Sequence, residues 1–249
     1  MRVLLSNDDG IEAPGITALR RTLEDLDWEV YVAAPDRERS ATGHGITVHR
    51  PLRIRELNWK ENSRGWAVDG TPADCVKLAL ETFLPGPPDL VISGINRGAN
   101  LGTDVLYSGT VSAAFEGMIN GYTSLAVSLT AYDDPDFAPA AAFVRRFLLH
   151  MPRLPGCAML NINIPPGEPR GIRITRLGRR RYVNVFHRRT DPRGRTYFWM
   201  AGDIEDAGNG PDTDVAAVAD GFVSITPLHC DLTDYGLMDA LRELENGRT

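Results

Sequence analysis

The sequence predicts an α/β fold in which a parallel sheet is covered by helices on both faces and a β-rich extension follows. Short apolar runs alternate with segments of helical periodicity over the first part of the chain. The runs are apolar throughout, as strands are when helices cover both faces of their sheet. The length of 249 residues and the hydrophobic content of 43% suit one large domain. We therefore expect a single α/β domain over residues 1–249, with the β-rich extension at about residues 171–235.

The first part of the chain contains the alternating strands and helices. Val3–Leu5 is a short apolar run that ends in Asn-Asp-Asp-Gly, a turn signal. A helix is expected after Pro14, where apolar residues recur at helical spacing: Ile16, Leu19, Leu23 and Leu26. Further strands are expected at Glu29–Ala33, Leu90–Ser93, Ser124–Leu129 and Ala158–Ile164. Further helices are expected at Pro72–Leu84, which Thr71 can cap, and at Thr110–Asn120 and Phe137–His150.

The second part of the chain departs from this alternation. Residues 171–201 have the pattern of extended, hairpin-like segments, and nine arginines but only one acid, Asp191, lie between Arg173 and Arg195. Two interpretations are open, an anion-binding arm or a solvated edge hairpin that also packs on another subunit, and we favour the second. The remaining expectations are a loop at Gly202–Asp214, a strand at Phe222–Thr226 and a terminal helix at Tyr235–Asn246.

Composition excludes several classes of protein. The net charge of −6 argues against a stable nucleic-acid partner held by phosphate neutralisation. The three cysteines, Cys75, Cys157 and Cys230, are too few and too scattered for a disulfide framework. The N-terminus lacks a signal-peptide core and no apolar run reaches the ~18 residues of a membrane span, so we expect a cytoplasmic protein with no membrane contact. The P-loop, GxGxxG, GxSxG and HExxH motifs are also absent from the sequence.

Polar oxygen ligands follow three of the predicted strands. Asp8 and Asp9 come directly after the first strand, Ser40 lies in the loop after the second, and Asn96 follows the strand at residues 90–93. Because parallel strands end at one edge of the sheet, we expect these side chains to converge there. Adjacent carboxylates repel each other unless a cation neutralises them. The set predicts one divalent ion, Mg²⁺ or Mn²⁺, at a site that Ca²⁺ can also occupy, in preference to Zn²⁺.

A hydroxyl-bearing turn opens the helix predicted at residues 110–120. Ser108, Gly109 and Thr110 are small enough for close approach, and a helix N-terminus offers free N–H groups and a partial positive charge to phosphate. Ser108 or Thr110 alone could simply cap the helix. A metal site and a helix N-terminus at one sheet edge predict phosphoryl chemistry. His44 and His49 are weaker candidates for a proton donor, and His229-Cys230-Asp231 is interpreted as the exit of a strand rather than a metal triplet.

Together these motifs resemble the SurE survival-protein family. The resemblance is carried by these segments, in order: SNDDG, APDRERSATGHGIT, DGTPADCV, PDLVISGINRGANLGTDVLYSGTVSAAFEG and TDVAAVADGFVSITPL. It implies a Rossmann-like, three-layer α/β/α domain with a mostly parallel sheet, plus a β-hairpin and a C-terminal extension. It also implies a metal-dependent nucleotidase acting on nucleoside 5′-monophosphates, often 3′-monophosphates and sometimes short polyphosphate.

The resemblance also implies roles for individual residues. The family's metal ligands fall on Asp8, Asp9, Ser40 and Asn96. Its phosphate-binding turn falls on Ser108, Gly109 and Thr110, and Asn96 is expected to contact phosphate as well. Members form homodimers or homotetramers in which the hairpin and the C-terminal segment are exchanged between subunits. Some members carry a histidine as proton donor where this chain has Tyr235, so the general acid is left unassigned.

The mechanism expected from these residues is direct attack of metal-activated water on phosphorus. Asp8 and Asp9 would hold the cation, one of them orienting or deprotonating the water, and Ser108 would act with the phosphate turn. One alternative enzyme is an aspartyl-phosphate phosphatase with Asp8 as nucleophile, which Gly10 disfavours because such enzymes carry a second acid there. The non-enzyme alternatives are a nucleotide or phosphate sensor and an RNA-binding module that uses the Arg173–Arg195 stretch.

Overall fold

A nine-stranded, mostly parallel sheet forms the centre of the computed structural model, which describes residues 1–154, 156–206 and 208–244. The strand order is β3-β4-β2-β1-β5-β6-β7-β13-β8, and the β3–β4 and β7–β13 pairs are antiparallel. The strand bounds are β1 Arg2–Ser6, β2 Glu29–Pro35, β3 Ile54–Lys60, β4 Ser63–Val68, β5 Leu90–Arg97, β6 Ser124–Leu129, β7 Met159–Ile164, β8 Ile172–Ile174 and β13 Val223–Leu228. The parallel sheet expected from the apolar runs is therefore confirmed.

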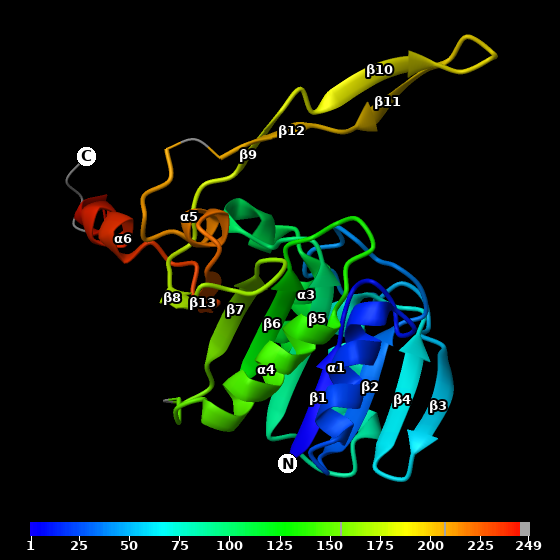
Figure 1. Ribbon diagram of the computed structural model, residues 1–249. Coiled ribbons are helices and arrows are strands. Elements are labelled where there is room, and N and C mark those ends of the chain that lie inside the picture. Colours follow the sequence, from blue (N-terminus) through cyan, green and yellow to red (C-terminus); the bar gives the residue numbers. More distant parts are fainter. Residues whose placement is uncertain (155, 207, 245–249) are drawn as a thin grey trace.

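Helices cover both faces of the sheet (Figure 1). The bounds of the helices are α1 Pro14–Glu24, α2 Pro72–Leu78, α3 Gly109–Ile119, α4 Ala138–His150, α5 Asp214–Ala219 and α6 Tyr235–Leu241. A π-helical turn, Ala79–Phe83, continues α2, and 3₁₀ turns lie at Gly102–Leu106 and Arg242–Leu244. Within the described part of the chain, no helix has the length and apolarity that a membrane span requires.

Alternate residues of β1 supply the two halves of the core. Val3 and Leu5 are buried in the cluster that includes Leu19 of α1 and Val144 of α4. Leu4 points to the opposite face and is buried with residues of α2 and α3. Because alternate side chains of β1 point to opposite faces and both faces are buried, residues 3–5 are all apolar. The three-layer α/β/α architecture follows, as the sequence predicts.

A long two-stranded arm projects from this body (Figure 1). Its base is the antiparallel pair β9 (Arg181–Val183) and β12 (Asp203–Glu205), and its tip is the hairpin of β10 (Phe186–Thr190) and β11 (Thr196–Met200). Every residue of β10 and β11 is exposed in the isolated chain. The hairpin expected within residues 171–201 is therefore present.

The structure corrects three expectations about the elements. The loop predicted at Gly202–Asp214 contains β12, because residues 203–205 pair with β9. The helix predicted at Pro72–Leu84 is α-helical only to Leu78 and then π-helical. The terminal helix begins at Tyr235 as predicted but ends at Leu241, and residues 245–246 of the prediction lie outside the described residues. The β3–β4 hairpin and α5 had not been predicted.

Candidate active site

The Asp8–Asp9 turn is held by the side chain of Asn7. The Asn7 Nδ2 donates to the carbonyl of Gly10 at 2.8 Å, and the Asn7 Oδ1 accepts from the Gly10 N–H at 3.2 Å. Gly10 has φ of +105°, a conformation that L side chains rarely adopt. The sequence Asn-Asp-Asp-Gly therefore turns sharply at the carboxyl end of β1 and presents both carboxylates at the sheet edge.

Asp8 is the more deeply buried of the two carboxylates, with 6% of the residue exposed. Its Oδ1 accepts a hydrogen bond from the hydroxyl of Thr110, which is the second residue of α3. Burial raises the pKa of Asp8 to about 6, and the neighbouring charge of Asp9 adds to this, although the Thr110 hydroxyl opposes it. The protein alone therefore stabilises the ionised form of Asp8 poorly.

Asp9 is half-buried and its pKa is also raised, first by burial and then by the negative charge of Glu38. Its Oδ2 accepts the backbone N–H of Arg97 at 3.2 Å. In the described part of the chain, neither Asp8 nor Asp9 has a basic side chain within ion-pair distance. A bound cation would stabilise the ionised forms of both carboxylates.

Backbone contacts bring the loop that carries Ser40 and the end of β5, which carries Asn96, to this turn. The N–H of Arg39 donates to the carbonyl of Asp8 at 2.7 Å, and the Arg97 contact to Asp9 places Asn96 beside it in the chain. Ser40 is exposed, and its hydroxyl donates to Glu38 Oε1 at 2.7 Å. The Asn96 Nδ2 donates to the carbonyl of Gly98 at 2.9 Å, which leaves the amide oxygen as its available ligand atom.

The donor set fits a hard divalent cation. Among the described residues, no three His, Cys, Asp or Glu side chains are grouped to hold a metal ion. A metal ion at this edge would therefore depend on the two carboxylates of Asp8 and Asp9 together with the neutral oxygens of Ser40 and Asn96. Oxygen-only ligands of this kind suit Mg²⁺ or Mn²⁺.

The predicted phosphate turn lies directly against Asp8. Ser108 is the N-cap of α3, and its hydroxyl accepts the N–H of Val111 at 3.0 Å. A Cβ on Gly109 would lie 2.8 Å from the Asp8 Cβ and 2.9 Å from its Oδ2, so only glycine fits there. The helix begins at Gly109, one residue before the predicted start. The structure thus brings Gly109 and Thr110 to Asp8, while Ser108 performs the capping role that its sequence context also allowed.

His44 contacts a buried carboxylate of α3. Its Nε2 lies 2.9 Å from Glu116 Oε2, and Lys77 Nζ lies 3.2 Å from the other carboxylate oxygen. The contact to His44, followed by those to Asn120 and Lys77, lowers the pKa of Glu116 to about 2. This cluster fastens the loop after β2 to α3. His49 is exposed, as are the residues of the His229-Cys230-Asp231 triplet.

Tyr235 lies far from Asp8 within one chain. It is exposed at the start of α6, beyond the β8 edge of the sheet, whereas β1 lies inside the sheet (Figure 1). Its hydroxyl donates to Asp231. Tyr235 therefore does not reach the site of its own chain in this arrangement.

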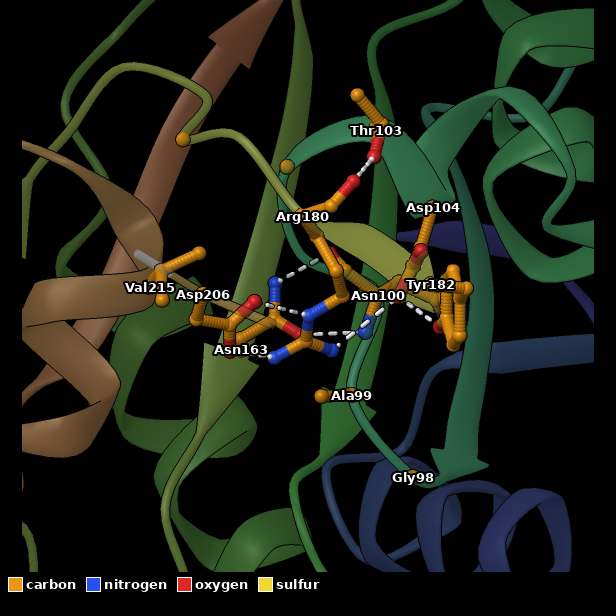
Figure 2. A network of polar contacts seen from close by, with 12 residues as sticks. Gly98, Ala99, Asn100, Thr103, Asp104, Asn163, Arg180, Tyr182, Asp206 and Val215 are labelled. Carbon is orange, nitrogen blue, oxygen red and sulfur yellow. Dashed lines mark hydrogen bonds and ion pairs between the residues drawn. The ribbon is translucent and has the colours of Figure 1, made fainter. Parts of the chain in front are cut away.

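A polar network not anticipated from the sequence joins the base of the arm to the loop before the phosphate turn (Figure 2). The Arg180 guanidinium, with 8% of its side chain exposed, donates to Asp104 at 3.1 Å and to Asp206 at 2.9 Å. Tyr182 also donates to Asp104, at 2.9 Å, and its pKa is raised to about 12 by burial and by that carboxylate.

Asp104 links this network to the site through its main chain. Its carbonyl accepts the N–H groups of Tyr107 and Ser108 at 3.0 and 3.1 Å. The main chain of Asp104 therefore holds the residues that lead into the phosphate turn. Its side chain contacts the base of the arm. The sequence carries no local signal of this pairing, because Asp104 and Arg180 are 76 residues apart.

The chain is similar to proteins of one family over nearly its whole length. A family model described as "Survival protein SurE" matches residues 3–184. The chain is 62% identical to the 5′-nucleotidase SurE of Pelotomaculum thermopropionicum over 247 residues, covering 98% of this chain and 95% of that protein. It is 60% identical to the 5′-nucleotidase SurE of Desulforudis audaxviator, covering 98% and 97%. The crystal structure of the SurE protein from Aquifex aeolicus superposes with a TM-score of 0.83 at 42% identity, covering 98% of this chain and all of that one.

Proposed function

This chain belongs to the SurE survival-protein family, and on that premise we propose that it is a 5′-nucleotidase that hydrolyses nucleoside 5′-monophosphates to nucleoside and inorganic phosphate. The observation that carries the proposal is the Asp8–Asp9 pair, in which Asp9 is half-buried and Asp8 is buried against the N-terminus of α3. We extend the proposal to dependence on a divalent metal ion, Mg²⁺ or Mn²⁺, and to 3′-monophosphates and short polyphosphate as further substrates.

Asp8, Asp9, Ser40 and Asn96 would hold the metal ion. The chemistry that such an ion supplies is a lowered pKa of water and neutralisation of phosphoryl charge. Asp9, the more accessible carboxylate, would orient the attacking water or accept its proton. Asp8 accepts a hydrogen bond from the Thr110 hydroxyl, which would fix the orientation of its carboxylate.

The N-terminus of α3 would bind the phosphoryl group. Its free N–H groups and partial positive charge favour the non-bridging oxygens, whose charge is redistributed in the transition state. The absence of a side chain at Gly109 lets the start of α3 pack directly against Asp8. Asn96 can donate or accept at the same edge, while the Ser108 hydroxyl, which accepts from Val111, retains its proton for donation to phosphate.

Phosphate release tests the proposal. The wild-type protein is assayed with 5′- and 3′-nucleoside monophosphates and tripolyphosphate, in Mn²⁺, in Mg²⁺ and in excess chelator. We expect chelator-sensitive turnover, highest with a 5′-monophosphate. Asp9→Asn should lose at least about 100-fold in kcat and should bind Mn²⁺ more weakly, with an unchanged circular dichroism spectrum. Asp25→Asn, at an exposed position at the end of α1, is the matched control.

Four outcomes would contradict the proposal. Turnover that survives chelation would remove the metal dependence, and near-wild-type kcat in Asp9→Asn would remove the role of that carboxylate. Binding of nucleotides without any phosphate release would favour a nucleotide sensor instead. A trapped aspartyl phosphate on Asp8 would favour the nucleophilic mechanism.

We also propose that the protein forms a homo-oligomer through the arm and the C-terminal helix. Large apolar side chains are exposed on both in the isolated chain, among them Phe186, Phe198, Trp199, Leu237 and Leu241. Monomeric proteins rarely leave such contiguous apolar segments in solvent, whereas interfaces between subunits use them. The molar mass from light scattering measures the oligomeric state and distinguishes a dimer from a tetramer.

A further inference from the structure

A small cavity opens directly beside Asp9, where strands β1, β2, β5 and β6 end. It has a volume of about 180 Å³, and it is lined by Asp9, Glu38 and Arg97 and by Asp134 in the segment after β6. Pockets that enclose a whole drug-sized ligand measure about 300–1,000 Å³. This cavity is therefore large enough for one ring of a ligand, and it shares the Asp9 wall with the proposed metal site.

The cavity has an apolar wall and a polar rim. Pro14 at the start of α1 and Pro135 before α4 line it, together with the buried ring of Phe137. Gly15 lets α1 lie close to β5, since a Cβ there would be 1.9 Å from the Ile95 carbonyl oxygen and 3.0 Å from the Phe137 ring. These walls are rigid, because Pro14 and Pro135 have restricted backbones and the Phe137 ring is packed in the core.

The rim suits a ligand that both donates and accepts hydrogen bonds. The exposed carboxylates of Glu38 and Asp134 accept hydrogen bonds when ionised, and the exposed Arg97 guanidinium donates them, so a group that carries hydroxyls matches this rim. A sugar ring has both properties, hydroxyl donors at its edge and C–H groups on its faces that pack on proline. In a nucleoside monophosphate, the ring bonded nearest to the phosphorus is the ribose.

We propose that this cavity binds the ribose of the nucleoside monophosphate, with Asp134 and Glu38 accepting hydrogen bonds from its free hydroxyls. The inference rests on the proposed function, because it places the phosphoryl group at Asp8 and Asp9. The site then distinguishes ribonucleotides from nucleotides that lack the sugar hydroxyls.

The test compares AMP with 2′,3′-dideoxy-AMP in Mn²⁺, for the wild type, Asp134→Asn and Asp133→Asn. Asp133 makes a matched control because it is the neighbouring acid and lines a different cavity. Asp134 has φ of +39°, a conformation that Asn tolerates, so the exposed substitution should leave the fold intact. The wild type should prefer AMP by at least about tenfold in kcat/KM, as expected for a hydrogen bond to a charged acceptor.

Asp134→Asn should reduce this preference by about fivefold or more, mainly through the KM of AMP, while Asp133→Asn leaves it unchanged. Equal kcat/KM for the two nucleotides in the wild type, or equal effects of the two substitutions, would overturn the inference and leave the nucleotidase activity standing. If neither nucleotide is hydrolysed, the proposed function fails. Calorimetric Kd values for the same two nucleotides then test the ribose cavity separately, and equal values would overturn it.

Discussion

Replacing Glu116 by Gln removes the charge that fastens the loop after β2 to α3. The carboxylate has 6% of its side chain exposed, and it is contacted by His44 at 2.9 Å, Asn120 at 2.9 Å and Lys77 at 3.2 Å. Gln keeps the shape but offers one acceptor where the carboxylate offers two. The loop also carries Ser40, so its attachment matters to the proposed metal site.

The magnitude follows from the pKa of Glu116. The pKa is lowered from 4.5 to about 2, and each pKa unit corresponds to about 1.4 kcal/mol, so the ionised group contributes about 3 kcal/mol to stability at neutral pH. Because the folded-state pKa is depressed, this contribution is fully present above pH 4.5. It is lost as the pH falls from about 4.5 toward 2, where the carboxylate is protonated in the folded state too.

Urea unfolding followed by circular dichroism measures the effect. The difference in unfolding free energy between wild type and Glu116→Gln should be about 3 kcal/mol at pH 7 and about 1.4 kcal/mol at pH 3. Glu12→Gln is the control, because Glu12 and its partner Arg55 are 74% and 60% exposed and such surface pairs contribute about 0–1 kcal/mol. A difference below about 1 kcal/mol at pH 7, or one that does not shrink at pH 3, would refute the reasoning.

Two further substitutions test contacts around the site. Thr110→Val removes the hydroxyl that lowers the pKa of Asp8, so in the metal-free protein that pKa should rise above about 6; an unchanged value in an NMR titration would contradict the contact. Arg180→Met leaves the carboxylates of Asp104 and Asp206 without their shared partner and should destabilise the base of the arm by about 3 kcal/mol. Amide exchange in β9 and β12 should then be faster, and unchanged protection would show that the network does not hold the arm.

Much of the fold could be predicted because its information is local. The strand at Val3–Leu5 is apolar at each position, and β1 is buried on both faces. Thr71 precedes Pro72 and lies three residues before Asp74, and in the structure it forms a capping box at the start of α2. The Asn-Asp-Asp-Gly turn could be predicted for the same reason, since Asn7 and Gly10 determine its shape between themselves.

The elements that could not be predicted depend on tertiary contacts. β3 lies at the edge of the sheet and is mostly exposed, so its sequence lacks the apolar run that marks a buried strand. β12 is a strand only because it pairs with β9, about 20 residues earlier in the chain. Propensity within either segment does not specify such a pairing.

The sequence by itself determined the α/β class and the sheet edge at which Asp8, Asp9, Ser40, Asn96 and the Ser108–Thr110 turn are carried, because parallel strands end on one side of their sheet. Only the tertiary structure decided which side chains touch there. It set Thr110 and Gly109 against Asp8, paired His44 with Glu116 and joined Arg180 to Asp104. Those partners are between 72 and 102 residues apart, and a contact across such a separation depends on how the helices pack on the sheet and leaves no periodicity in the sequence.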